Sequence, residues 1–200
     1  MKNKPLILII VFLLTISSTF QAVQAKKRKK TIKYEFNKKN SITLHGFIGK
    51  KMYKKFLKDV KKFKNKKMNI LINSNGGKIF YVNKIVGYIN KNNIKTTCMA
   101  AYSALSGGFM ILQSCDKRLA LPKSILMMHK VYCNLPPCTR IREINLIVQM
   151  QMARSLSMPY KMYNSFIKDG NWWMTGRMAY QYNAVDEVVE RERIKIGKFK

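Results

Sequence analysis

Acidic residues are scarce in this chain: nine Asp and Glu stand against 39 Lys and Arg, which gives a formal net charge of +30. Such an excess favours attraction to polyanions that weakens as salt rises. The lysines recur from Lys26 to Lys200 without an aromatic-bearing sheet motif or a zinc-finger spacing, which argues against nucleic-acid binding as the main function. We expect only weak binding to polyanions or to an anionic membrane surface.

Histidine is also rare, because the chain holds only His45 and His129. Neither lies at ligand spacing from two cysteines, so the sequence argues against a zinc site. His45 lies within a predicted strand and is interpreted as structural. We expect no metal and no other cofactor.

Long apolar runs are absent beyond the first 25 residues. Near the start, Lys2 and Lys4 precede an apolar run of about ten residues, which is short of the roughly 20 that a membrane-spanning helix needs. The stretch closes on Val23-Gln24-Ala25, with small residues at the −3 and −1 positions of a cleavage site. We therefore predict a signal peptide at residues 1–25 and a soluble protein that is exported to the periplasm or secreted. An uncleaved anchor is the alternative.

Cysteine is infrequent but even in number, which permits disulfides in an exported chain. A turn-rich spacer separates Cys133 from Cys138, so these two residues could form a bridge close to His129. Cys98 and Cys115 would then be the other pair. Free buried thiols are the alternative.

One folded domain is expected at residues 41–190, between a flexible basic tail at 26–40 and a basic tail at 191–200. Apolar periodicity alternates between strand and helix. The predicted strands cover 41–46, 68–73, 96–100, 118–121 and 125–129, and the predicted helices cover 51–64, 79–89, 106–112 and 139–167, with a break near Pro159. Repeated crossovers of this kind predict an α/β fold with a largely parallel sheet surrounded by helices.

Three small-residue and polar sites follow one another in an order that suits a serine hydrolase. Gly76-Gly77 follows a strand, Ser106-Gly107 opens a helix, and His129 closes another strand. A serine hydroxyl needs an imidazole to take its proton and backbone N–H groups to hold the developing oxyanion. We expect the oxyanion hole to use Gly107 together with Gly77, or less favourably Gly76.

From about Ile42 to Val189 the chain resembles the proteolytic subunit of the Clp protease, in the clan that includes signal peptide peptidase A and the crotonases. The matching segments occur in family order: Leu44-His45-Gly46, Ile72 to Gly77, Arg118 to Ser124 ahead of His129, Met174-Thr175, and Ala184 to Asp186. The resemblance implies repeated ββα units and a serine-type endopeptidase that cleaves peptides or unfolded proteins.

The resemblance also implies roles for individual residues. Ser106 is favoured as nucleophile over Ser103, because glycine follows it. His129 matches the catalytic base. Asn171 stands where the family has an orienting aspartate, and Asp169 could substitute for it. The missing carboxylate keeps a second reading open, in which the chain is an inactive homologue that acts as a basic binding module at the cell envelope.

Clp-type subunits assemble into rings and work with a cytoplasmic ATP-dependent unfoldase. An exported copy would have neither ATP nor an unfoldase beside it, which argues against that partner. We expect a homo-oligomer, but not necessarily the family's double ring, because the segment Thr139–Ile167 that matches the interdigitating handle is shortened by several residues.

Overall fold

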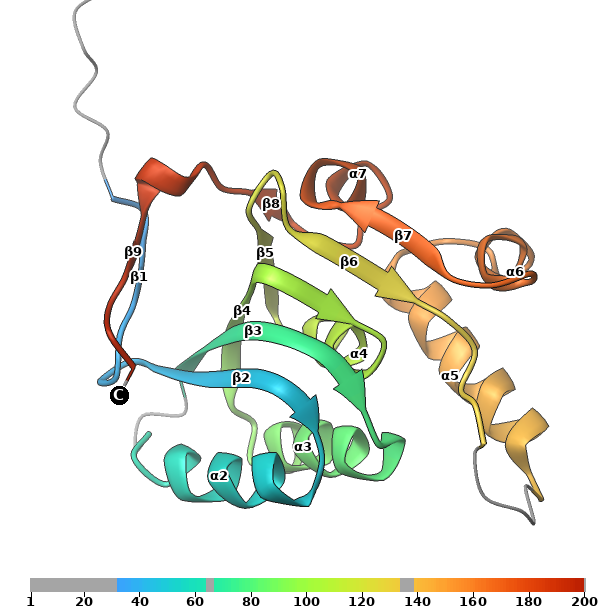
Figure 1. The fold of residues 1–200 in the computed structure, drawn as a ribbon, viewed down its shortest axis with the longest axis horizontal. Helices are drawn as coiled ribbons and strands as arrows, with labels where there is room; N and C mark the ends of the chain where they lie inside the picture. Colours follow the sequence, from blue (N-terminus) through green and yellow to red (C-terminus); the bar gives the residue numbers. More distant parts are fainter. Residues whose placement is uncertain (1–31, 64–66, 134–138, 200) are drawn as a thin grey trace, which may run out of the picture. The chain divides into compact units, whose positions relative to one another are not determined.

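The computed structural model of the protein describes residues 32–63, 67–133 and 139–199 (Figure 1). The predicted signal peptide lies outside these residues. Within them, no helix combines the length and the apolar character that crossing a bilayer requires.

A seven-stranded sheet forms the centre of the domain (Figure 1). Strands β2, β3, β4, β5 and β8 are parallel neighbours in that order, β6 pairs with β4, and β7 joins β6 as the only antiparallel neighbour in this sheet as described. The bounds are Ser41–Ile48 for β2, Lys67–Gly77 for β3, Lys95–Leu105 for β4, Lys117–Ala120 for β5, Ile125–Met128 for β6, Trp172–Thr175 for β7 and Glu187–Val188 for β8. The predicted mixed α/β fold with a mostly parallel sheet is confirmed.

Helices follow most of the strands, as the periodicity predicts. They are α2 (Lys50–Val60), α3 (Ile79–Lys91), α4 (Gly107–Gln113), α5 (Ile141–Ser155), α6 (Tyr160–Ile167) and α7 (Gly176–Gln181), with a 3-10 turn at Arg191–Arg193. The break expected in the long helical segment lies between α5 and α6, where Pro159 is the N-cap of α6. Proline has no N–H to donate and suits the start of a helix better than its interior.

Helices α2 and α3 lie side by side next to β2 and β3 (Figure 1). The inner side of α2 presents Met52, Phe56 and Val60 at intervals of four residues, and all three are buried. Phe56 meets Tyr88 of α3 edge to face, with 5.6 Å between the ring centroids. These contacts hold the two helices together and leave the opposite side of α2 to solvent.

Strand β4 pairs with β3 on one side and, on its other side, with two strands one after the other. Its first half pairs with β5 and its last three residues, Ser103 to Leu105, pair with β6. β4 therefore ends next to the end of β6, and α4 begins at that point. This arrangement brings the Ser106 turn close to the strand that ends before His129.

Two short strands lie in the segments that were predicted as basic tails. Residues Tyr34–Phe36 form β1 and Ile194–Ile196 form β9, and the two strands pair in parallel (Figure 1). Phe36 and Ile194 are buried in a small second apolar cluster. In the sequence, Phe36 follows Glu35 and Ile194 lies between Arg193 and Lys195. Single apolar residues next to charged ones do not show a strand pattern.

A disulfide joins Cys98 of β4 to Cys115, just after α4. Both cysteines are buried, so the bridge ties the helix that carries the Ser106 turn to the central strand. One of the two pairs left open by the sequence is thereby confirmed. Cys133 is also disulfide-bonded, and Cys138 lies outside the described residues.

Arg118 makes a buried polar network at the edge of the core. Its guanidinium donates to Asp186 Oδ1 at 2.6 Å and to Gln113 Oε1 at 2.8 Å. The backbone N–H of Arg118 donates to Asp186 Oδ2 at 2.7 Å. The network joins β5, α4 and the segment before β8. Burial alone would raise the pKa of Asp186, but the hydrogen bonds from Arg118 outweigh it and lower that pKa.

We expect the Asp186→Asn variant to lose about 2 kcal/mol of unfolding free energy at neutral pH, as is typical of a hydrogen bond to a charged group. The pKa of Asp186 is lower in the folded protein than the value of 3.8 expected in the unfolded chain. The ionised carboxylate therefore stabilises the fold at pH values above 3.8, and this stabilisation is lost as the pH falls through the folded-state pKa. The difference between wild type and variant should therefore shrink on acidification below about pH 5. Urea denaturation between pH 3 and 7 measures it. A difference independent of pH would contradict the assignment.

Candidate active site

Ser106 occupies the turn that joins β4 to α4. Its backbone has φ 51° and ψ −114°, a combination that side chains with a Cβ rarely adopt. The Ser106 N–H donates to the Met127 carbonyl at 2.7 Å, which fixes the turn against β6. A serine on a strained strand-to-helix turn presents its hydroxyl above the sheet, as a nucleophile requires.

Close backbone approach explains the glycines around Ser106. A Cβ on Gly76, where φ is +90°, would lie 2.8 Å from the Ser106 Cβ. A Cβ on Gly77 would lie 2.3 Å from the Ile48 carbonyl oxygen, and one on Gly107 would lie 2.6 Å from Val82 Cγ2. Hence no side chain fits at any of the three positions.

The amides of these glycines differ in their partners. The Gly76 N–H donates to Ser74 Oγ at 3.0 Å, so it already has an acceptor inside the protein. Both glycines lie close to Gly107: a Cβ added at Gly76 would be 2.9 Å from the Gly107 nitrogen, and one added at Gly107 would be 3.4 Å from the Gly77 nitrogen. Because the Gly76 N–H already has an acceptor, Gly77 and Gly107 are the favoured pair to face a substrate carbonyl.

His129 follows β6 and lines the same cavity as Ser106. Its Nδ1 contacts the carbonyl oxygen of Lys130, and its ring stacks on Tyr132 with 4.9 Å between centroids. A carbonyl oxygen can only accept, so the Nδ1 that contacts it bears a hydrogen. In the neutral form of the ring this leaves the lone pair on Nε2, which is the tautomer that a general base needs.

Asn171 and Asp169 lie just before β7, the strand that runs antiparallel to β6. Met128 pairs with Trp172, and continuing that register by one residue places Asn171 opposite His129. Lys130 Nζ donates to the Lys168 carbonyl at 2.9 Å and so joins the two segments. Asn171 and Asp169 are both exposed, and neither side chain makes a hydrogen bond to another described residue. In this structure the Lys130 carbonyl, rather than either side chain, contacts Nδ1.

Ser103, the alternative nucleophile, belongs to a different polar chain on the face of the sheet. Its hydroxyl donates to Asn73 Oδ1 at 2.9 Å, and Asn73 Nδ2 donates to His45 Nδ1 at 3.2 Å. The hydroxyl proton of Ser103 therefore goes to an amide oxygen that cannot act as a base. This geometry favours Ser106.

The cavity beside Ser106 has a volume of about 630 Å³ and is lined mainly by apolar side chains. Among its lining residues are Phe47, Phe80, Met110, Val131, Tyr132 and Ile144. No sequence motif marks these residues as parts of the site. The position of Phe47 at the end of a strand indicates only that its side chain points outward. The local sequence pattern does not show that apolar residues from distant segments line one cavity.

The described part of the chain contains no cluster of three or more His, Cys, Asp or Glu that could hold a metal ion. The candidate site therefore consists of a strained serine, an imidazole in a defined tautomer, two closely spaced glycine amides and an apolar cavity.

Residues 24–192 match the family described as Clp protease. The chain belongs to the Clp protease family. Membership supports a peptidase-type function for this fold. No curated protein matches the chain.

Proposed function

We propose that this member of the Clp protease family is an exported serine peptidase with Ser106 as nucleophile and His129 as general base. The observation that carries the proposal is the Ser106 turn, where an unfavourable φ of 51° is maintained directly beside glycines that exclude any side chain. Backbone strain of this kind persists where the surrounding structure fixes it, and it concentrates at active sites.

In the proposed reaction, His129 Nε2 takes the proton of the Ser106 hydroxyl while Ser106 Oγ attacks the peptide carbonyl carbon. The Gly77 and Gly107 N–H groups receive the oxyanion. His129 then returns the proton to the leaving amine, and water hydrolyses the acyl-enzyme. In this proposal the Lys130 carbonyl accepts from Nδ1–H throughout, and Asn171, one residue beyond the Met128–Trp172 pair of β6 and β7, is a second candidate acceptor.

Export is part of the same proposal, because the chain begins with a basic and apolar segment typical of a signal peptide. The Cys98–Cys115 disulfide supports it, since structural disulfides persist mainly in oxidising compartments. We further propose peptides or unfolded proteins as substrates and a homo-oligomer as the assembly.

Labelling with a fluorophosphonate probe tests the nucleophile. We expect the folded, oxidised protein to be labelled on one serine, and peptide mapping to locate the label at Ser106. Heat-denatured protein should not react, because the activated geometry is lost. Ser103→Ala is the matched control and should be labelled like the wild type. The absence of labelling would favour the second reading, a basic binding module without catalysis.

A further inference from the structure

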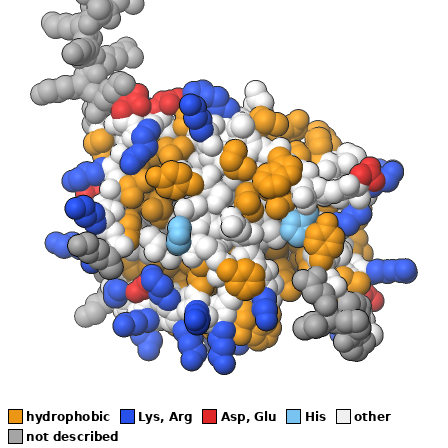
Figure 2. Space-filling view, in the orientation of Figure 1, with side chains coloured by type: hydrophobic (Ala, Val, Ile, Leu, Met, Phe, Trp, Pro, Cys, Tyr) orange, Lys and Arg blue, Asp and Glu red, His pale blue; other side chains and the backbone are white. Residues whose placement is uncertain are grey.

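A dense lysine face covers the exposed side of α2 and the turn that follows it. It consists of Lys50, Lys51, Lys54, Lys55, Lys58, Lys61 and Lys62, all of which are exposed. Their spacing of three, four and seven residues places them on one side of the helix, opposite Met52, Phe56 and Val60. Figure 2 shows lysine and arginine side chains gathered along the lower edge, where α2 lies in Figure 1.

Little negative charge offsets the lysine face. Asp59 is the only acidic residue on α2, and it binds Lys55 at 2.6 Å and Lys62 at 2.8 Å. The other five lysines of the face make no ion pair within the part of the chain that the structure describes. Helix α3, the neighbour of α2, contains no acidic residue at all. Holding these cations together costs electrostatic repulsion that an anionic surface would relieve.

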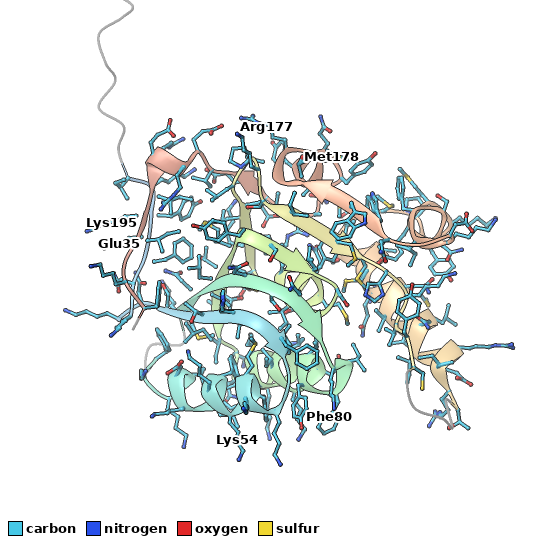
Figure 3. The ribbon with its side chains drawn as sticks, viewed as in Figure 1. Glu35, Lys54, Phe80, Arg177, Met178 and Lys195 are labelled. Atoms are coloured by element: carbon cyan, nitrogen blue, oxygen red, sulfur yellow. A yellow bond between two sulfur atoms is a disulfide. The ribbon has the colours of Figure 1, made fainter. Side chains whose placement is uncertain are left out.

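Two exposed aromatic side chains adjoin the lysine face. Phe47 is 63% exposed and Phe80 is 59% exposed, although each is large and apolar. Lys84 Nζ lies 4.9 Å from the centroid of the Phe80 ring. Figure 3 shows Lys54 and Phe80 on the same lower side of the molecule. Because Phe47 and Phe80 also line the cavity, this aromatic rim connects the lysine face with the candidate site.

We propose that the lysine face and the aromatic rim dock the protein on an anionic phospholipid bilayer. Lysines at a membrane surface are attracted to acidic headgroups, and each contributes a similar increment when several act together. Aromatic and other apolar side chains of a surface-bound helix enter the headgroup region. Docking in this orientation would bring the cavity mouth next to the bilayer.

The shape of the face favours lipid over nucleic acid. All seven of its cations are lysines, whose point charges attract the phosphodiesters of both ligands, so the geometry decides between them. The face lies on the outer side of a helix, whereas single-stranded nucleic acid is held in grooves with stacking platforms. A planar array of headgroups matches an outward helical face.

Vesicle co-sedimentation of the full chain tests the proposal. The probes are vesicles of phosphatidylcholine alone and vesicles that contain 30% phosphatidylglycerol, so that binding to neutral lipid measures any contribution independent of the lysines. We expect binding to the anionic vesicles to weaken about a hundredfold in the triple variant Lys51→Glu/Lys54→Glu/Lys58→Glu. It should also fall as salt rises.

The matched control changes the same amount of charge elsewhere: Lys123→Glu/Arg154→Glu/Lys161→Glu, three exposed cations without an ion pair among the described residues. Retained binding in this control supports the lysine face. Equal losses in both triples, no preference of the wild type for anionic vesicles, or tighter binding to duplex DNA at equal phosphate would each overturn the proposal. The readout is binding, so it is independent of whether Ser106 is an active nucleophile.

Discussion

The Ser106→Gly variant is expected to be more stable than the wild type and inactive. Ser106 has φ 51° and ψ −114°, which glycine adopts at little cost and residues with a Cβ adopt only under strain. Relief of that strain should raise the free energy of unfolding by about 1 kcal/mol, even after the greater entropy of glycine in the unfolded chain is counted. Urea denaturation of both proteins measures the difference.

Ser106→Ala is the matched control, because alanine removes the hydroxyl but keeps the Cβ. Peptide hydrolysis should fall at least about 10³-fold in both variants, since a nucleophile and its base act as a unit. Only the glycine variant should gain stability. Lower stability for Ser106→Gly than for Ser106→Ala would show that the turn stores no strain, and the main argument for Ser106 would fail.

Restoring a carboxylate opposite His129 is expected to increase catalysis. In the Asn171→Asp variant, the β6–β7 register would place an aspartate beside the imidazole. A carboxylate stabilises the imidazolium that forms during acylation, and we expect kcat to rise about 100-fold.

Asp169→Asn tests whether the charge already present two residues upstream contributes. Asp169 is exposed and makes no hydrogen bond to a described residue, so its loss should leave both kcat and the pH profile unchanged. A large fall in activity would instead identify Asp169 as the orienting group. If Asn171→Asp leaves activity unchanged, the Lys130 carbonyl is the sole partner of Nδ1 and Asn171 has no part in catalysis.

Much of the framework could be predicted from local pattern. The buried alternation of Met68, Ile70 and Ile72 indicates a strand, and the four-residue spacing of Met52, Phe56 and Val60 indicates a helix. Both features arise because each element must bury one side. The short strands β1 and β9 escaped prediction, since three residues each are too few to show a period and their partner lies at the other end of the chain.

The candidate site was predictable as a set of residue types but not as a set of partners. Order along the chain indicates Ser106, His129 and paired glycines, because a serine nucleophile needs an imidazole to take its proton and backbone N–H groups to hold the oxyanion. Which oxygen contacts His129 Nδ1, which glycine N–H already has an acceptor, and which hydroxyl proton goes to Asn73 all depend on atoms from separate strands.

The sequence by itself determined the parallel α/β framework and the strong positive charge, and it supplied a serine and a histidine as candidate reactive groups. These follow from periodicity, composition and chemical type, which are local properties. Only the tertiary structure decided that Cys98 bonds to Cys115, that Ser106 rather than Ser103 occupies the strained turn, and that Phe47 and Phe80 line one cavity with Ser106. Each of these depends on how the strands and helices are placed in space, which local pattern does not specify.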